Sequence, residues 1–559
     1  MKLRIIICTV LLALLRTTWA QNPKWFKKAR KAQVTVITYN TQDEIHQGQG
    51  FFISEDGTII AEYDLFKDAV RGTVVDAEGT EHSITKVLGA NSLYNVARLN
   101  TTNEKNSIQV KTAQTQSVGS VVYIMPLCNN DKKSLCITDT IKNVQEFSDE
   151  NYPYYTLSKT IDERFAGCPA FNEEGELIGH IQLSASGSDK PSFILGAQYS
   201  NSLTIKALDA NNADLTAINI PKELPAEESQ AVTYLFLMNK QNAQIYEEQI
   251  NAFIKKYPSN TTGYILLAEL KVKQQDYKAA EGIYSLAMNK QTEAEDELHH
   301  SYAKLLYQCG LKEKAPSDGW DMEHALKEAE AAYSCNPLPL YTALEGLCLY
   351  ALKRYEESHD KFIKVTQSNM RSAEYFMYAS QCKQMLLAPT EEILALQDSA
   401  VNCYSKPYPA EAANYIYLRG KTLASMEKFR EAVADMNEFE HLVSGNVTAN
   451  FCYEREQVEM QCRQFSNALK DIERAVNLEP EEPLYRAEEA VVNYRVGQLN
   501  EAIAAAKEAI RLEETFADAH RILGICLRDQ GKTTEAKKSL QKAIEYGDTV
   551  AQSILDKIK

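Results

Sequence analysis

Two patterns of hydrophobic and polar residues divide the chain of 559 residues. From about residue 34 to residue 195, apolar and polar residues alternate in short runs separated by glycine and asparagine, as in QVTVITY, GQGFFIS and GELIGHIQL. An alternation with a period of two predicts β-strands that bury one face. After a polar stretch the pattern becomes helical, so we predict a multidomain protein in which an all-β part precedes an all-α part.

The helical part repeats itself. Alanine recurs at Ala468, Ala502 and Ala536, and glycine recurs at Gly497 and Gly531, always with a step of 34 residues. Small residues at a fixed step let paired helices approach closely, and this step and pattern resemble tetratricopeptide repeats. The resemblance implies about eight or nine helix pairs over residues 226–559, stacked into a right-handed superhelix whose concave face binds protein or peptide partners.

Four segments of the β part carry a likeness to a known family: GQGFFISEDGTIIAEYDLFKDA, TVVDAEGTEHSITKVLGANSLYNVARL, ERFAGCPAFNEEGELIGHI and FILGAQYSNSLTIKAL. In this order they resemble the segments of the trypsin-fold, HtrA-like serine proteases. The resemblance implies a trypsin-like double barrel over residues 34–208. Residues 209–225, which are mostly polar, are then expected to link the barrels to the repeats.

The positions that match the family's catalytic triad lack its functional groups. The family's histidine, aspartate and serine fall on Asp64, Asn95 and Ala166, and two glycines of its oxyanion loop fall on Arg164 and Cys168. Loss of nucleophile and base together costs on the order of a millionfold in turnover. The resemblance therefore implies a pseudoprotease with no catalytic residues, which is not an enzyme.

Other nucleophiles and bases are the alternative, an enzyme of the serine-protease family with an unconventional active site. Cys168 carries a thiol but lies two residues from the nucleophile's register, and a lone histidine such as His46 or His180 is more often structural than catalytic. Asp64 has no evident partner that would make it an acid or a metal ligand. No cluster of cysteine and histidine has zinc-ligand spacing, so we predict neither a metal nor a cofactor.

The N-terminal residues predict export. Residues 1–20, MKLRIIICTVLLALLRTTWA, have the basic start, apolar centre and small-residue end of a signal peptide, and residues 21–33 form a short basic lead-in segment. We therefore expect a secreted protein of the periplasm or envelope. In such a compartment Cys128 and Cys136 either form a disulfide across a hairpin or remain free thiols.

The charge balance limits the kinds of partner. A formal net charge of -16 argues against nucleic acid, whose binding requires clustered lysine and arginine. No segment after the signal peptide is apolar enough to span a membrane. The sequence therefore predicts a protein–protein interaction scaffold in which the repeats bind partners and the inactive barrels form a second docking module. The alternative is a structural subunit of an envelope complex; the partner and the oligomeric state are not readable from the sequence.

Overall fold

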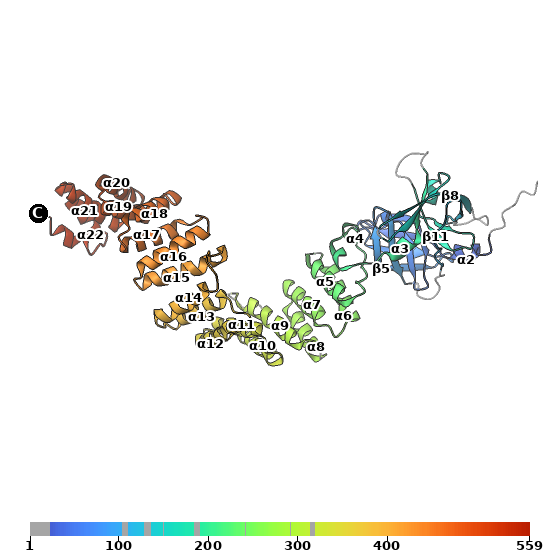
Figure 1. Cartoon of the computed structure of the whole chain (residues 1–559), viewed down its shortest axis with the longest axis horizontal. Coiled ribbons are helices and arrows are strands. Elements are labelled where there is room, and N and C mark those ends of the chain that lie inside the picture. Colours follow the sequence, from blue (N-terminus) through green and yellow to red (C-terminus); the bar gives the residue numbers. More distant parts are fainter. Residues whose placement is uncertain are drawn as a thin grey trace, which may run out of the picture. The chain divides into compact units, whose positions relative to one another are not determined.

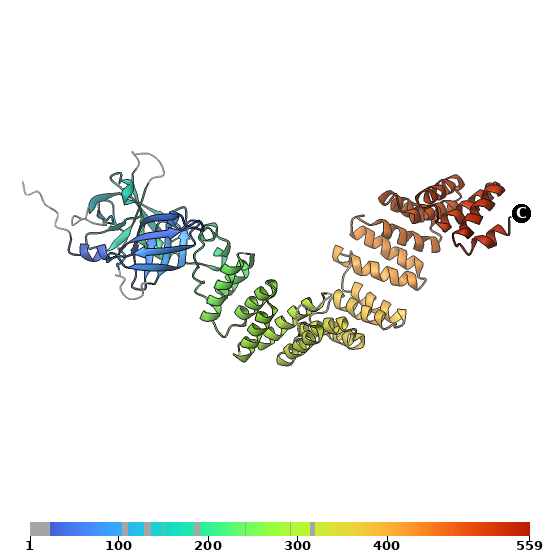
Figure 2. The ribbon, with the colours of Figure 1, turned by 180° about the vertical axis from the view of Figure 1, so that it is seen from behind.

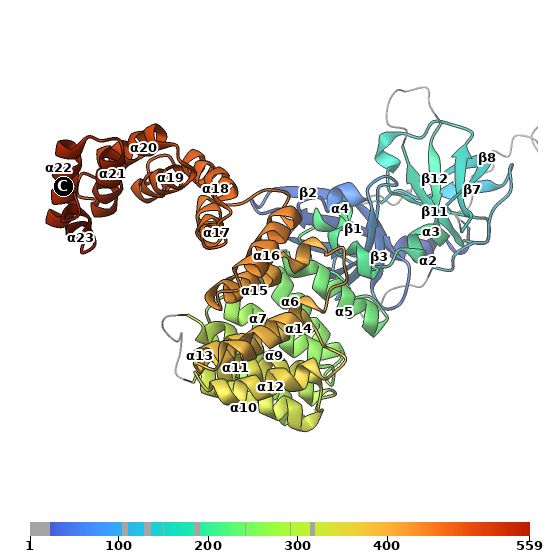
Figure 3. The same ribbon diagram turned by 60° about the vertical axis from the view of Figure 1, so that its left-hand side comes forward.

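The computed structural model describes residues 23–102, 110–127, 136–148, 150–183, 191–240, 242–290, 292–312 and 319–558. The predicted signal peptide and Cys128 lie outside the described residues, so the signal peptide and the disulfide stay predictions. The chain forms two compact units, Met1–Glu293 and Ala294–Lys559, which are described separately below. Figures 1 to 3 show the ribbon from three directions.

The first unit begins with a closed antiparallel barrel of six strands in the order β1-β2-β3-β6-β5-β4. Buried and more exposed residues alternate along most of its fourth and sixth strands, whereas the third strand and the first four residues of the first strand, which include Val34 and Val36, are buried on both faces. The strands are β1 (Gln33–Tyr39), β2 (Ile45–Phe52), β3 (Thr58–Ala61), β4 (Arg71–Val75), β5 (Glu81–Asn91) and β6 (Val96–Thr101).

A second closed barrel of six strands follows in the order β10-β11-β12-β9-β8-β7. Gly179 lets two of its strands approach, because a Cβ atom at this residue would lie 1.9 Å from the carbonyl oxygen of Leu195. The predicted trypsin-like double barrel is confirmed. The strands are β7 (Val121–Ile124), β8 (Ile137–Phe147), β9 (Tyr152–Leu157), β10 (Pro169–Phe171), β11 (Leu177–Gln182) and β12 (Phe193–Gly196).

The basic lead-in segment packs against both barrels. Its helix α2 (Phe26–Lys31) buries Phe26 in the same core cluster as β1, while its lysines and Arg30 stay largely outside. Trp25 packs on Phe171 of the second barrel, with ring centroids 5.4 Å apart, and its Nε1–H donates to the carbonyl oxygen of Glu173 at 2.8 Å. The segment therefore helps to fix one barrel against the other.

Residues 209–225, which the sequence predicts to be a linker, lie against the first barrel. After η3 (Ala207–Asn211) and α4 (Ala213–Thr216), the backbone N–H of Val87 donates to the carbonyl oxygen of Pro221 at 2.8 Å. The N–H of Glu223 donates back to the carbonyl oxygen of Val87 at 2.8 Å. The segment is thus held by backbone hydrogen bonds.

The first helices share their hydrophobic core with the first barrel. Tyr234, Ile250 and Phe253 are buried in one cluster with Val87 and with residues of β1. Besides α3 (Ala197–Ser202), which follows β12, the helices that come after residue 225 in this unit are α5 (Glu228–Leu237), η4 (Met238–Lys240), α6 (Ala243–Lys256), α7 (Thr261–Lys273) and α8 (Tyr277–Asn289).

The second unit is an array of helices in which neighbours along the chain pack in pairs (Figure 1). Ala468, Ala502 and Ala536 are fully buried, and Gly497 and Gly531 adopt positive φ angles of 85° and 79° at the turns between helices. The predicted all-α array is confirmed. Its helices are α9 (Glu295–Gly310), α10 (Met322–Cys335), α11 (Pro339–Ala351), α12 (Tyr355–Thr366), α13 (Ala373–Met385), α14 (Thr390–Val401), η5 (Ala410–Ala412), α15 (Ala413–Ser425), α16 (Phe429–Leu442), α17 (Ala449–Gln461), α18 (Phe465–Leu478), α19 (Pro483–Val496), α20 (Leu499–Leu512), α21 (Ala517–Asp529), α22 (Thr533–Glu545) and α23 (Ala551–Leu555). Within the part of the chain that the structure describes, none of the helices has the length and apolar character needed to cross a membrane.

Ion pairs at one recurrent position join the two helices of two repeats. Arg419 of α15 binds Asp435 of α16 through two hydrogen bonds of 2.8 Å, and Arg455 of α17 binds Asp471 of α18 through bonds of 2.6 and 2.7 Å. In each pair, the arginine and the aspartate are 16 residues apart in the sequence. Two parallel N–H···O bonds fix the orientation as well as the distance of the helices.

Candidate functional site

The structure brings two of the three triad positions into direct contact. Asp64 lies in η1 (Tyr63–Leu65), and Asn95 lies in the turn directly before β6, where its φ angle is 42°. The Oδ1 atom of Asn95 accepts a hydrogen bond from the backbone N–H of Asp64 at 2.9 Å. The asparagine side chain therefore holds the backbone of η1 rather than the Asp64 side chain.

Glu62 lies between these residues and the turn that contains Ala166. Its Oε1 accepts a hydrogen bond from Nδ2 of Asn95 at 3.3 Å, and its Oε2 lies 3.3 Å from the place where a Cβ atom would stand on Gly167. Burial, with the charge of Asp64 as a second cause, raises the pKa of the Glu62 carboxyl to about 7. The sequence analysis missed this residue, because Glu62 belongs to no motif and its environment comes from distant segments.

The N–H groups that could form an oxyanion site are already used. After η2 (Glu163–Phe165), the N–H of Ala166 donates to the carbonyl oxygen of Glu163 at 3.0 Å. The N–H of Arg164 donates to Oδ1 of Asp162 at 3.0 Å, and the Arg164 guanidinium binds the same carboxylate. Oxyanion stabilisation requires N–H donors aimed at the developing charge, and these two are directed into their own turn.

Gln49 of β2 connects the two barrels beside this turn. Its Nε2 donates to the carbonyl oxygen of Arg164 at 3.0 Å, and its Oε1 accepts from the N–H of Leu127 at 2.9 Å. The Sγ of Cys168 donates to the same Oε1 at 3.3 Å. Cys168 is fully buried, so the candidate thiol nucleophile has no exposed surface in this structure.

The two candidate histidines lie in contrasting environments. His46 is exposed on β2. His180 on β11 is buried beside Phe51, and burial lowers its pKa to about 4, so the imidazole is neutral near pH 7. Within the described ranges neither ring nitrogen of His180 has a hydrogen-bond partner. Its burial therefore gives His180 the character of a packed core residue.

Aromatic side chains lie beside Asn95 where the two barrels meet. Tyr94 precedes Asn95, and its ring is 4.6 Å from that of Phe147 and 5.3 Å from that of Tyr199. Gln182 of β11 donates to the carbonyl oxygen of Tyr94 and accepts from the hydroxyl of Tyr154 at 2.9 Å. These contacts fix the strand end that carries Asn95.

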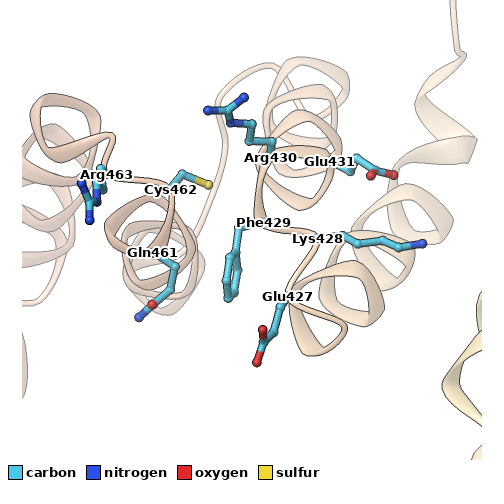
Figure 4. Close-up of a pocket in the computed structure, with 8 residues that line it drawn as sticks. All are labelled: Glu427, Lys428, Phe429, Arg430, Glu431, Gln461, Cys462 and Arg463. Carbon is cyan, nitrogen blue, oxygen red and sulfur yellow. The ribbon is translucent and has the colours of Figure 1, made fainter.

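An open hollow of 410 Å³ lies between two helix turns of the second unit. In Figure 4 the ring of Phe429 extends between the turn that begins α16 and the turn that follows α17, and Arg430 extends to the opposite side. Charges of both signs surround the ring, which suits the surface of a macromolecule better than an enclosed small ligand. The lining residues are Glu427, Lys428, Phe429, Arg430, Glu431, Gln461, Cys462 and Arg463.

A smaller cavity of 280 Å³ lies among α13, α14 and α15. Its lining is mostly uncharged and polar, with Lys421 as its one charged residue. The lining residues are Met377, Gln381, Gln384, Gln397, Leu418, Lys421, Thr422 and Ser425. In the described part of the chain, no group of three or more histidine, cysteine, aspartate or glutamate side chains is placed to hold a metal ion.

Two buried glutamates of α17 carry raised pKa values. Burial, followed by the charge of Glu488, raises the pKa of Glu456 to about 8. Burial, followed by the charge of Asp471, raises the pKa of Glu459 to about 8. Both carboxyl groups are therefore largely protonated at pH 7.

Comparison with known proteins identifies the repeats. Residues 488–551 match the family model for the tetratricopeptide repeat. This stretch of the helical part is therefore similar to the tetratricopeptide repeat. A similar curated protein is the small glutamine-rich tetratricopeptide repeat-containing protein 2 of Mycosarcoma maydis, 30% identical over 86 residues, which cover 15% of this chain and 24% of that protein. Another is the TPR repeat-containing thioredoxin TTL4 of Arabidopsis thaliana, 33% identical over 76 residues, or 14% of this chain and 11% of that protein.

Solved structures similar to this chain include two proteases. The HtrA-type protease AlgW with tripeptide is 17% identical with a TM-score of 0.27, and the match covers 31% of this chain and 59% of that one. The serine endoprotease from Yersinia pestis is 20% identical with a TM-score of 0.26, covering 31% and 62%. At such low identities a likeness concerns the fold alone. The strand order of the two barrels, given above, describes that fold without reference to these structures.

Proposed function

We propose that this protein is an exported scaffold for protein–protein interaction, whose tetratricopeptide repeats bind protein or peptide partners and whose double barrel is an inactive docking module. The match of residues 488–551 to the tetratricopeptide repeat carries the proposal, because such arrays present extended surfaces to other proteins. Partners that are nucleic acids are disfavoured by the net charge of -16.

Two features of the turn that contains Ala166 support the absence of proteolysis. Ala166 has no hydroxyl to act as nucleophile, and the N–H groups of Ala166 and Arg164 donate within their own turn. A peptide carbonyl bound there would meet neither a nucleophile nor free donors. Hydrolysis of an unfolded protein by the purified chain, abolished by Glu62→Gln or Cys168→Ala, would overturn this part of the proposal.

A second candidate, an enzyme with an unconventional site, is favoured by one observation. A carboxyl group with a pKa of about 7, as at Glu62, is suited to general acid–base catalysis near neutral pH. Its weakness is the lack of an accessible nucleophile nearby, since Cys168 is fully buried. Screening hydrolysis of peptides and esters between pH 5 and pH 9, with Glu62→Gln as the control, separates the two candidates.

Binding is tested by capture with the full chain. Tagged protein is recovered from the native envelope, and its partners are compared with those of a variant carrying Arg430→Glu and Arg463→Glu at the hollow of Figure 4. The matched control is Arg511→Glu, another largely exposed arginine on the array. Partners lost only from the hollow variant support the scaffold, whereas the absence of any stoichiometric partner of the unaltered chain contradicts it.

Export is part of the proposal and has its own test. It is supported by the sequence of residues 1–20, which is typical of a cleaved signal peptide. Mass spectrometry of the protein from its native host should find a mature chain that begins near Gln21. A chain that retains residues 1–20 and fractionates with the cytosol would contradict export.

A further inference from the structure

The hollow of Figure 4 carries opposite charges at its two ends. Its volume is 410 Å³, and the half-buried ring of Phe429 lies between the two turns that border it. In the view of Figure 4, Arg430 and Arg463 lie above the ring, whereas Glu427 lies below it. A ligand that spans the hollow therefore meets positive charge at one end, an aromatic surface in the middle and negative charge at the other end.

The remaining two charged residues of the lining are directed elsewhere. Lys428 and Glu431 extend away from the facing turn in Figure 4. Their charges are opposite in sign, so their effects on a charged ligand in the hollow partly cancel. The charge that a ligand must match is therefore determined by Arg430, Arg463 and Glu427.

The charges at the two ends are exposed and are not neutralised within the protein. In the part of the chain that the structure describes, Arg430, Arg463 and Glu427 form no ion pair. Arg455 of the neighbouring helix shows the contrast, because it is buried and bound by Asp471. A charged partner can therefore bind at the ends of the hollow without first breaking an internal ion pair.

Two of these charged residues occupy turn positions that favour glycine. Glu427 and Arg463 both have a φ angle of 59°, and Gly497 takes the equivalent position in a later turn with a φ angle of 85°. A side chain in this left-handed conformation costs free energy relative to glycine. Lys353 and Leu387 also adopt positive φ angles at earlier turns, so strain alone does not mark the hollow. The hollow differs because two such residues of opposite charge line one space.

The mixture of charges selects among classes of ligand. A ligand with only negative groups, such as a phosphate, would bring a negative group towards Glu427, and a ligand with only positive groups would face two guanidinium groups. A neutral apolar ligand would remove water from the charged groups without replacing it. A peptide segment with an acidic, an apolar and a basic side chain matches all three parts of the hollow.

We propose that the hollow binds a segment of a partner protein in which an acidic, an apolar and a basic residue follow one another. The acidic side chain binds Arg430 and Arg463, the apolar side chain packs on the ring of Phe429, and the basic side chain binds Glu427. This inference rests on the proposed protein-binding function, names the chemistry of the partner and places the contact at helix turns.

The thiol of Cys462 provides a measurement of occupancy. It is half-buried in the lining of the hollow, and burial raises its pKa, so its alkylation by iodoacetamide is followed in mildly alkaline buffer. A peptide that occupies the hollow should slow this alkylation in a saturable manner. Cys335 of α10 is exposed and lies outside the lining, so its alkylation is the internal control and should not change. Mass spectrometry of the digested chain measures both rates.

Three pentapeptides with capped ends serve as probes of the full chain: GELKG, GKLEG and GQLQG. The first two carry the acid and the base in opposite orders, so one of them matches whichever direction the partner segment runs. We expect one or both charged probes to protect Cys462, and the uncharged probe to leave its alkylation unchanged. Protection by neither charged probe, or equal protection by the uncharged probe, overturns the proposal.

Reversal of charge at one end tests which residues bind the probe. In the double variant Arg430→Glu and Arg463→Glu, we expect the affinity for the protecting probe to fall on the order of tenfold. The probe GKLKG should bind this variant better than it binds the unaltered chain. Because the charge of Arg430 also acts on the Cys462 thiol, rates with and without probe are compared within each protein. Equal affinity of both proteins for every probe contradicts the proposal.

Two further variants keep the test decisive. Arg495→Glu is the matched control, because Arg495 at the end of α19 is exposed and lies outside the hollow; its probe affinity should equal that of the unaltered chain. If the double variant folds poorly, Glu427→Lys tests the opposite end of the hollow. The probe GELEG should bind Glu427→Lys better than the unaltered chain, and the absence of any preference contradicts the proposal.

Failure of this inference is distinct from failure of the proposed function. If the unaltered chain and the double variant capture the same stoichiometric partners while no probe protects Cys462, the scaffold stands and the hollow is not its docking site. If the unaltered chain captures no partner, the proposed function fails whatever the probes do.

Discussion

The Ala166 turn of the double barrel and the helical array hold their polar groups in different environments. Around Ala166, the hydrogen bonds of Gln49 and Asn95 and the ion pair of Arg164 with Asp162 are exposed to solvent. In the array, Arg455 binds Asp471 where both side chains are buried. Removing one partner should therefore cost more in the array than at the Ala166 turn, because it leaves a buried charge unpaired.

The largest expected effect is the loss of a charged pair in the array. In Arg455→Met, Asp471 would remain buried without its cation, while Glu440 keeps its ion pair with Arg474, and we expect the free energy of unfolding to fall by about 3–5 kcal/mol. Thermal unfolding followed by circular dichroism measures this loss. Arg511→Met, which breaks an exposed pair with Glu508, is the control and should cost less than about 1 kcal/mol. Equal losses in the two variants would contradict the greater cost expected for the buried pair.

Steric crowding in the second barrel should produce the next largest effect. Gly179→Ala places a methyl group 1.9 Å from the carbonyl oxygen of Leu195, so β11 and β12 must separate, at a cost of about 2–4 kcal/mol. Gly282→Ala in α8 is the matched control, because its Cβ atom would meet nothing within 4 Å. That control should gain about 0.5–1 kcal/mol through helix propensity. Hydrogen exchange of the β11 amides measures the first change, and unchanged exchange would contradict it.

A third prediction concerns pH and the array alone. Because the pKa of Glu456 is raised to about 8 in the folded chain, the folded state holds a proton that the unfolded state releases near pH 4.5. Stability from this group is therefore complete below about pH 4.5 and declines as pH rises through 8, where Glu488, Glu459 and Asp471 oppose its charge.

Glu456→Gln removes the titrating group and should flatten that decline. We expect this variant to be more stable than the unaltered chain at pH 9 by on the order of 2 kcal/mol, with little difference at pH 4.5. Unfolding midpoints measured across this range test the expectation. An equal pH dependence in both proteins would show that Glu456 is not buried as a neutral acid.

The smallest expected effect concerns catalysis at the positions of the triad. A triple variant with Asp64→His, Asn95→Asp and Ala166→Ser restores the functional groups, but the N–H groups of residues 164 and 166 stay engaged. Missing oxyanion donors alone cost about a hundred- to a thousandfold each. We expect no hydrolysis of an unfolded protein above background, and readily measured hydrolysis would show that the turn opens to accept substrate.

The sequence predicted both architectures because both rest on short-range periodicity. Alternation such as QVTVITY determines which face of a strand is buried, and the step from Ala502 to Ala536 determines where helices approach. The segment of residues 209–225 was harder to interpret, because its hydrogen bonds with Val87 join positions more than a hundred residues apart. Composition alone could not distinguish such a packed segment from a flexible linker.

The region around Ala166 could be predicted from the sequence only in part. The resemblance placed Asp64, Asn95 and Ala166 at equivalent positions, and their side chains follow directly from the sequence. Glu62 and Gln49 were missed because their importance comes from contacts with Gly167 and Arg164 across the barrels. The hollow of Figure 4 was likewise not predicted, since turns of two different helix pairs form it.

The core shared by the first barrel and the first helices has a consequence for how this chain could be inherited or engineered. Tyr234, Ile250 and Phe253 belong to the repeats by sequence, yet they are buried in one cluster with Val87 of the barrel. A fragment that begins at residue 226 would expose this apolar surface to water and would tend to aggregate. The first barrel and the helices that contribute to its core therefore form one folding unit, and a recombination that preserves folding must carry them together.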